Sequence, residues 1–171
     1  MIKTFLAVAG VILGVAVAAP SASWAQSEGK SAVAAKASAQ KKVVKKSNAK
    51  THRLAIQVAE NNPQLMNLAL NNARNVVEYY KSKGEGVAIE VVTFGPGLHM
   101  LRDDTSPVKQ RIAAMALDTP GVTFIACANT QANMSKQENK QITLVSEAKV
   151  MPSGVVRIME LQGKGYSYLR P

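Results

Sequence analysis

The sequence predicts an α/β protein in which helices cover a mainly parallel sheet. Short apolar runs alternate along the chain with longer segments whose apolar residues recur at helical spacing. The short runs are apolar at nearly every position, as is typical of strands that are covered on both faces. Residues that favour turns, chiefly Gly, Pro and Asn, separate the segments. This alternation favours a layered α/β fold.

Residues 1–25 have the pattern of a secretory signal peptide. Lys3 precedes an apolar run of 16 residues from Thr4 to Ala19, and Ser23 and Ala25 are small residues at the −3 and −1 positions of a cleavage site. The run is shorter than the roughly 18 residues expected of a membrane-spanning helix. We therefore predict export to the periplasm and cleavage before Gln26, with an uncleaved anchor as the alternative.

Residues 26–50 are predicted to form a basic, flexible linker rich in Ala, Lys and Ser. Residues 1–50 carry a net charge of +7, whereas residues 51–171 carry +3, so the high isoelectric point comes mostly from the N-terminal part. The linker has too few large apolar residues to offset the entropy of ordering. It is interpreted either as a solvated spacer or as a weak contact for an anionic membrane surface. Nucleic acid is not an expected partner of an exported protein.

Residues 51–171 have the length of one domain, and their first half predicts a strand, a helix and a second strand. The first strand is Leu54–Ala59. Asn62-Pro63 begins a helix, with Asn as the N-cap and Pro at the first helical position, and Gly84 ends it. The helix carries one apolar stripe: Met66, Leu70, Ala73, Val77 and Tyr80. The second strand is Val87–Phe94, and Gly95-Pro96-Gly97 ends it.

The second half predicts the same alternation. Ser106-Pro107 begins a helix with a stripe of Val108, Ile112, Met115 and Ala116, and Val122–Ala126 is the third strand. The spacing of Ser135 and Glu138 predicts a short helix there. The remaining elements are a strand near Ala148–Met151, a helix capped by Ser153 with Val155, Ile158 and Met159 on one face, and a final strand at Tyr166–Leu169.

Parallel strands joined by right-handed crossovers place all their carboxyl ends at one edge of the sheet, where α/β proteins bind ligands. Four loops that are distant in sequence should therefore share one rim. They contain Asn61 and Asn62, Gly95 to Gly97, Cys127 to Thr130, and Pro152 to Gly154.

Several common chemistries have no motif in this chain. It contains neither a G-x-x-x-x-G-K-[ST] loop nor a G-x-G-x-x-G turn. A single cysteine excludes a C-x-x-C redox pair, and His52 and His99 are not at a metal-binding spacing. We expect no metal and no cofactor. The arginines Arg102, Arg111 and Arg157 are interpreted as solvated charges on helical segments.

Cys127 is the candidate catalytic residue because it lies where the third strand ends. The thiolate is the reactive form of cysteine, and a nearby helix N-terminus or cation lowers the pKa of the thiol. Such a thiolate can accept sulfur as a persulfide or form a mixed disulfide. The alternative is a packed free cysteine without a chemical role.

The other rim residues are candidate ligand contacts. Gly95, Pro96 and Gly97 form a turn that lets the backbone approach a ligand, although the same residues suit a plain connection. His99 lies just beyond as a proton donor or polar wall, with an ordinary surface histidine as the alternative. The candidates that complete the set are Asn61, Asn129, Thr130 and Gly154.

Five segments together resemble the DsrE/DsrF-like family, and more narrowly its exported, single-domain branch. The resemblance covers about residues 51–171. The segments are Leu68–Asn75, Phe94–Leu101, Ala126–Thr130, Pro152–Val156 and Gly165–Pro171.

The resemblance implies a three-layer α/β/α sandwich with a five-stranded, mainly parallel sheet, and a homo-oligomer, either a trimer or a hexamer. Cytoplasmic relatives pass sulfur along as cysteine persulfides, and Cys127 matches their acceptor position. A sulfur carrier would need a donor and an acceptor protein. The predicted export separates this chain from those relatives. A non-catalytic module that binds a small ligand or supports assembly is therefore the alternative function.

Overall fold

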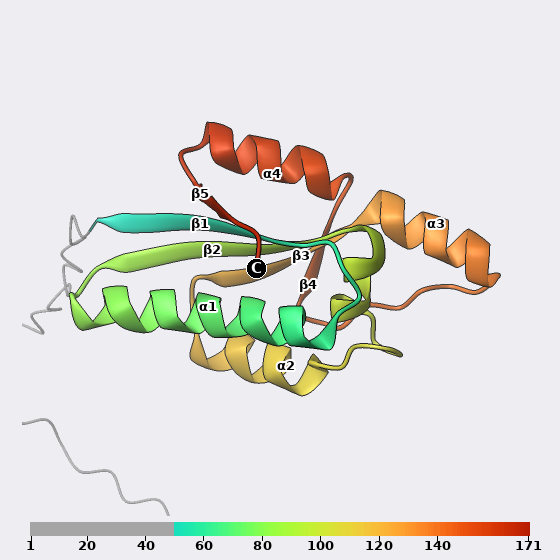
Figure 1. Ribbon diagram of the computed structural model, residues 1–171, viewed down its shortest axis with the longest axis horizontal. Helices are drawn as coiled ribbons and strands as arrows, with labels where there is room; N and C mark the ends of the chain where they lie inside the picture. The colour runs from blue at the N-terminus through green and yellow to red at the C-terminus, as the bar shows by residue number, and fades with distance from the viewer. Residues whose placement is uncertain (1–49) are drawn as a thin grey trace, which may run out of the picture. The chain divides into compact units, whose positions relative to one another are not determined.

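The computed structural model describes residues 50–171, so the predicted signal peptide and nearly all of the predicted linker lie outside the described residues. The domain is a three-layer α/β/α sandwich around a five-stranded sheet of order β4-β3-β2-β1-β5, which confirms the predicted fold class. Every strand pair is parallel. Helices α1 and α2 lie against one face of the sheet and α4 against the other (Figure 1).

The strands are β1 (Thr51–Val58), β2 (Gly86–Thr93), β3 (Val122–Cys127), β4 (Ala148–Met151) and β5 (Ser167–Leu169). The helices are α1 (Pro63–Ser82), the 3-10 helix η1 (Gly95–Leu101), α2 (Lys109–Asp118), α3 (Ala128–Glu138) and α4 (Gly154–Gly163). The chain adds β2, β3 and β4 successively on one side of β1. It then returns through α4 to place β5 on the other side of β1.

Helix α1 begins and ends as its sequence predicts. The side chain of Asn62 accepts hydrogen bonds from the N–H groups of Gln64 and Leu65, at 2.9 and 3.3 Å. Gly84, which follows the C-cap residue, has a φ of +70°, a conformation that glycine adopts without strain. The buried face of the helix contains Met66, Ala69, Leu70 and Ala73.

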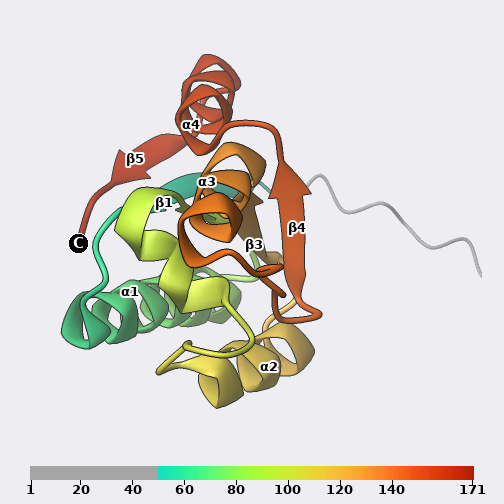
Figure 2. The same ribbon diagram turned by 90° about the vertical axis from the view of Figure 1, so that its right-hand side faces the viewer.

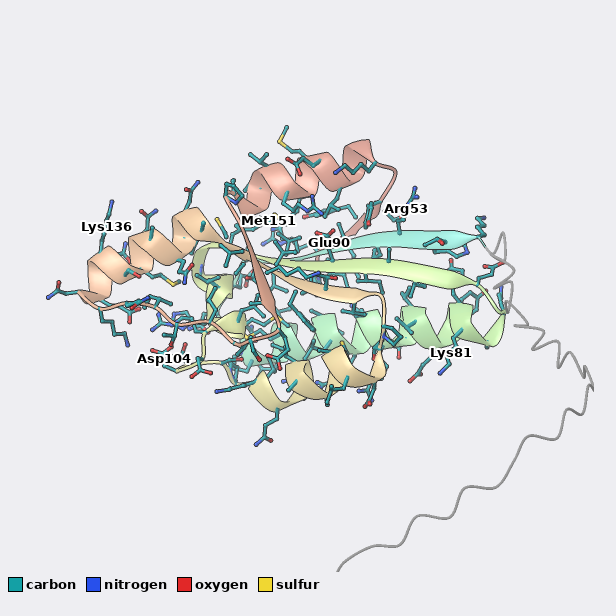
Figure 3. All side chains as sticks on the ribbon, turned by 180° about the vertical axis from the view of Figure 1, so that it is seen from behind. Arg53, Lys81, Glu90, Asp104, Lys136 and Met151 are labelled. Atoms are coloured by element: carbon teal, nitrogen blue, oxygen red, sulfur yellow. The ribbon has the colours of Figure 1, made fainter. Side chains whose placement is uncertain are left out.

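The two faces of the sheet carry separate apolar clusters. The larger cluster lies between the sheet and helices α1 and α2, and it includes Ile56, Val91, Phe124 and Ile112. The smaller cluster, beneath α4, consists of Ala55, Val92, Ile125, Ile158 and Leu161. A half-buried ion pair also lies under α4, where Arg157 donates two hydrogen bonds to the carboxylate of Glu90 on β2. Figure 3 shows Glu90 between the sheet and that helix.

The sequence predictions for α2 and α4 were wrong in detail. Helix α2 begins at Lys109, because Ser106 instead forms a local turn in which its Oγ accepts from the Val108 N–H at 3.3 Å. Ala116 of its predicted stripe is exposed. The stripe predicted for α4 is rotated: Val155 and Met159 are exposed, and Gly154, Ile158 and Leu161 are buried.

The helix predicted at Ser135 starts much earlier, because α3 begins directly after Cys127. Helix α3 buries none of its side chains, so it carries no apolar stripe by which the sequence could reveal it. Ser135 lies near its end, where the Oγ accepts from the Ile142 N–H at 3.2 Å. Among residues 50–171, no helix has the length and hydropathy needed to cross a membrane.

Candidate functional site

The carboxyl edge of the sheet brings together three loops that are far apart in sequence. The N–H of Gly95, after β2, donates to Thr130 Oγ1 at 3.0 Å. The N–H of Asn129, after β3, donates to the carbonyl oxygen of Pro152, after β4, at 3.3 Å. Figure 2 looks toward this edge, with α3 in front and the start of α4 above it. The predicted convergence is therefore confirmed for three of the four loops.

Cys127 lies at the centre of this arrangement, as the last residue of β3 and the N-cap of α3. The residue is only 4% exposed. Side chains alternate along a strand, so Cys127 is on the same face as Ile125, the face covered by α4. The thiol is thus enclosed between the first turns of α3 and α4.

Opposing effects act on the pKa of the Cys127 thiol. Burial raises the pKa, because it disfavours the charged thiolate. The hydroxyl of Thr130 and the backbone N–H groups of Gly154, Thr130 and Asn129 face the sulfur and lower the pKa. The Cys127 sulfur accepts no N-cap hydrogen bond from α3. These groups therefore act on it mainly through the electrostatic attraction of their N–H and O–H dipoles. The donors outweigh burial, and the pKa lies below its ordinary value.

Glycine at position 154 permits the close approach of the start of α4 to Phe94. A Cβ atom built there would lie 2.8 Å from Cδ1 of Phe94, which is closer than real side chains allow. Gly97 likewise lets η1 approach the end of β1, since a Cβ there would lie 2.2 Å from the carbonyl oxygen of Val58. Phe94, which lies against Gly154, was not among the predicted site residues. The sequence pattern there indicated only an ordinary strand residue.

The remaining predicted contacts lie on the same rim but serve local structure. His99 Nδ1 is 2.8 Å from Thr105 Oγ1, which ties η1 to the loop that follows it. Asn61 and Pro96 are exposed, and the neighbouring Asn62 caps α1. The structure therefore gathers Asn129, Thr130 and Gly154 around Cys127, with Gly95 bound to Thr130, whereas His99 and Asn61 are not among the groups that face the sulfur.

An apolar groove of about 220 Å³ lies between α4 and the β1–β5 side of the sheet. It is lined by Gln57, Phe94, Val155, Ile158, Met159, Gln162 and Tyr168. Because Phe94 also packs against Gly154, this end of the groove lies close to the thiol. Within residues 50–171, no cluster of three His, Cys, Asp or Glu side chains is arranged to hold a metal ion.

The prediction that Arg102 and Arg157 are solvated was wrong. Arg102 is 1% exposed and pairs with Asp104 and Glu138, and the side chain of Arg157 is 18% exposed and pairs with Glu90. A guanidinium that is withdrawn from water needs paired carboxylates to offset its lost hydration, and both arginines have them. Glu138 lies 36 positions from Arg102, and Glu90 lies 67 positions from Arg157, so local patterns do not reveal these pairs. Asp104 lies only two positions from Arg102.

Comparison with known proteins identifies a structural relative. The chain is similar to the solved structure of the protein of unknown function MTH1491 from Methanobacterium thermoautotrophicum, with 29% sequence identity and a TM-score of 0.59. The match covers 70% of this chain and 99% of that protein. No family model matches the sequence. No functionally curated protein matches it significantly.

Proposed function

We propose that this protein is a sulfur carrier in which the Cys127 thiolate accepts sulfane sulfur as a persulfide. The observation that supports this proposal is the set of donors around the sulfur, which lowers the pKa of the thiol despite its burial. A lower pKa increases the fraction of thiolate at neutral pH, and the thiolate is the nucleophile. The same N–H groups are placed to stabilise the negative charge of a bound persulfide.

The reaction transfers one sulfur atom from a donor persulfide, R–S–SH. The Cys127 thiolate attacks the terminal sulfur of the donor, and a new S–S bond forms. The donor's own S–S bond breaks, and R–S⁻ leaves with its electron pair. The carrier then holds Cys127–S–SH, and no separate oxidant or reductant is consumed. From the resemblance to the DsrE/DsrF-like family, we propose that one protein donates the sulfur and another accepts it. From the predicted signal peptide, we propose that the transfer takes place in the periplasm.

Intact-mass analysis after incubation with inorganic polysulfide tests this proposal. We expect the folded protein at neutral pH to gain the mass of a sulfur atom, and dithiothreitol to remove it. The Cys127→Ser variant, which has no thiol, should gain nothing. A folded protein that keeps its original mass, while the urea-unfolded chain is modified, would contradict the proposal.

A non-catalytic assembly module is the second candidate function, and the apolar surface around α4 favours it. Val155, Val156 and Met159 of α4 and Tyr168 of β5 are all exposed, by between 44% and 65%. Exposed apolar surface of this kind marks interaction sites. We infer that a second copy of this chain covers it, because α4 supplies both a wall of the apolar groove and the protruding Met159. Two copies can therefore place Met159 against each other's groove.

A further inference from the structure

Arg102 holds together an ion cluster at the far end of α3. Its Nε and Nη2 atoms donate to the carboxylate of Asp104 at 2.9 and 2.8 Å. Its Nη1 and Nη2 atoms donate to the carboxylate of Glu138, with Nη2 at 2.9 Å. Lys140 Nζ adds contacts of 2.9 Å to Asp104 and 3.2 Å to Glu138. Figure 3 shows Asp104 in the loop below α3.

This cluster matters because α3 has little apolar packing. The helix contains no buried side chain, and only the half-buried Met134 contacts the larger core. Its other attachments are polar, such as the hydrogen bond from Gln131 Nε2 to the Ile142 carbonyl at 2.8 Å. Helices in proteins are mostly held by packing of an apolar face. The position of α3 therefore depends strongly on Glu138, its last residue, and on the arginine that binds it.

The opposite end of the same helix surrounds the thiol. Asn129 and Thr130, in the first turn of α3, carry two of the N–H groups that face the Cys127 sulfur. A helix of 11 residues is a rod of about 16 Å, so an anchor at one end fixes the direction of the other. The first turn is also held locally, by hydrogen bonds from the Asn129 N–H to the Pro152 carbonyl and from the Gly95 N–H to Thr130 Oγ1. Tilting of the rod would strain these bonds and loosen the first turn from the sulfur.

We propose that Arg102 is a positioning residue for Cys127: its paired hydrogen bonds to Asp104 and Glu138 hold α3 with its first turn against the sulfur. Arg102 contacts neither the thiol nor a substrate. The proposal rests on the proposed function only for the chemical role of the thiol. The placement of the N–H groups around the sulfur is a property of the protein alone.

Two variants test the proposal: Arg102→Met, which removes the guanidinium, and Glu138→Gln, which removes one carboxylate at an exposed position. Two measurements are made on each. One is the pH midpoint of Cys127 alkylation by iodoacetamide, and the other is hydrogen exchange of the Asn129 and Thr130 amides. We expect the midpoint to rise by about one pH unit, which is a ten-fold loss of thiolate at neutral pH. We also expect these amides to exchange at least about ten-fold faster.

The matched control is Ile112→Val, a fully buried change on α2 that lowers global stability without touching α3. It should leave the midpoint unchanged. An unaltered midpoint in Glu138→Gln, or an equal shift in Ile112→Val, would overturn the proposal. Neither measurement uses a sulfur donor. Failure of the protein to accept sulfur would therefore refute the proposed function and leave this result intact.

Discussion

Thr130 shows how a single side chain can join two loops to the thiol. Its hydroxyl oxygen accepts the N–H of Gly95 at 3.0 Å, and the hydroxyl also lowers the pKa of Cys127. A hydroxyl has one proton to donate and lone pairs to accept, so it can serve both partners at once. This arrangement links the order of the Gly95 turn to the charge state of the sulfur.

Removing the Thr130 hydroxyl should therefore destabilise the thiolate form of Cys127 relative to the thiol. We predict that Thr130→Val raises the pKa of Cys127, because the sulfur loses a donor while its burial remains. The measurement is the pH dependence of thiolate absorbance, with Cys127→Ser as the blank. Thr130→Ser keeps the hydroxyl and should titrate like the native protein; a Val variant that did so as well would exclude the role of this group.

At the scale of single residues, the sequence predicted Cys127 and its neighbours better than it predicted the charges. The thiol follows an apolar run and precedes polar residues, so both its place at the strand end and its proximity to other loops follow from the parallel topology. The burial of Arg102 depends instead on Glu138, which lies 36 positions away. Only the folded chain brings the two residues together.

At the scale of elements, α1 and α3 show two ways of holding a helix. The apolar stripe, the Asn62 cap and the terminal glycine all predict α1 from its sequence. Helix α3 has none of these signals, since the cap is the backbone of Cys127 and the main anchor is an ion cluster. The predicted start of α3 was therefore too late, although the first turn of this helix forms part of the candidate site.

The ion cluster makes the stability of the domain depend on pH. Hydrogen bonds from Arg102 lower the pKa of Glu138 to about 2, below its unfolded value of about 4.3. A carboxylate with a lowered pKa stabilises the folded state above the unfolded pKa, and this contribution disappears as the pH falls through the folded pKa.

The Glu138→Gln variant should reveal this contribution in urea unfolding at a series of pH values. We predict that the native protein has the higher free energy of unfolding at pH values above about 5. The difference should shrink steadily between about pH 4.5 and pH 2. A difference that stayed constant over this range would show that the carboxylate charge is not what stabilises α3.

At the scale of the whole molecule, strand alternation in the sequence predicted the architecture. All five strands were expected near their observed positions, and the order of the sheet places β3 and β4 side by side, so that their loops meet at Cys127. The face that α4 presents to solvent was not predicted: the helix buries Gly154, Ile158 and Leu161 against the sheet, and Gly154 lies close to Phe94. That rotation exposes Val155 and Met159.

This exposed face leads to a prediction about assembly. We predict that residues 50–171 form a homo-oligomer at micromolar concentration, with α4 in the interface. Light scattering coupled to gel filtration measures the mass. Met159→Lys should shift the mass toward the monomer, because the interface would have to bury an unpaired charge. Leu117→Lys on α2, where the native side chain is also exposed, is the control and should not change the mass. A monomeric native protein would contradict the prediction.

The sharpest test of whether donors from α3 and α4 lower the pKa of the Cys127 thiol is a pH titration of this thiol in the folded native protein. We predict a midpoint clearly below the value of about 8.5 for an ordinary cysteine, and a return to that value in urea. A midpoint at or above the ordinary value in the folded protein would mean that burial prevails, and that Cys127 is a packed side chain without the proposed chemistry.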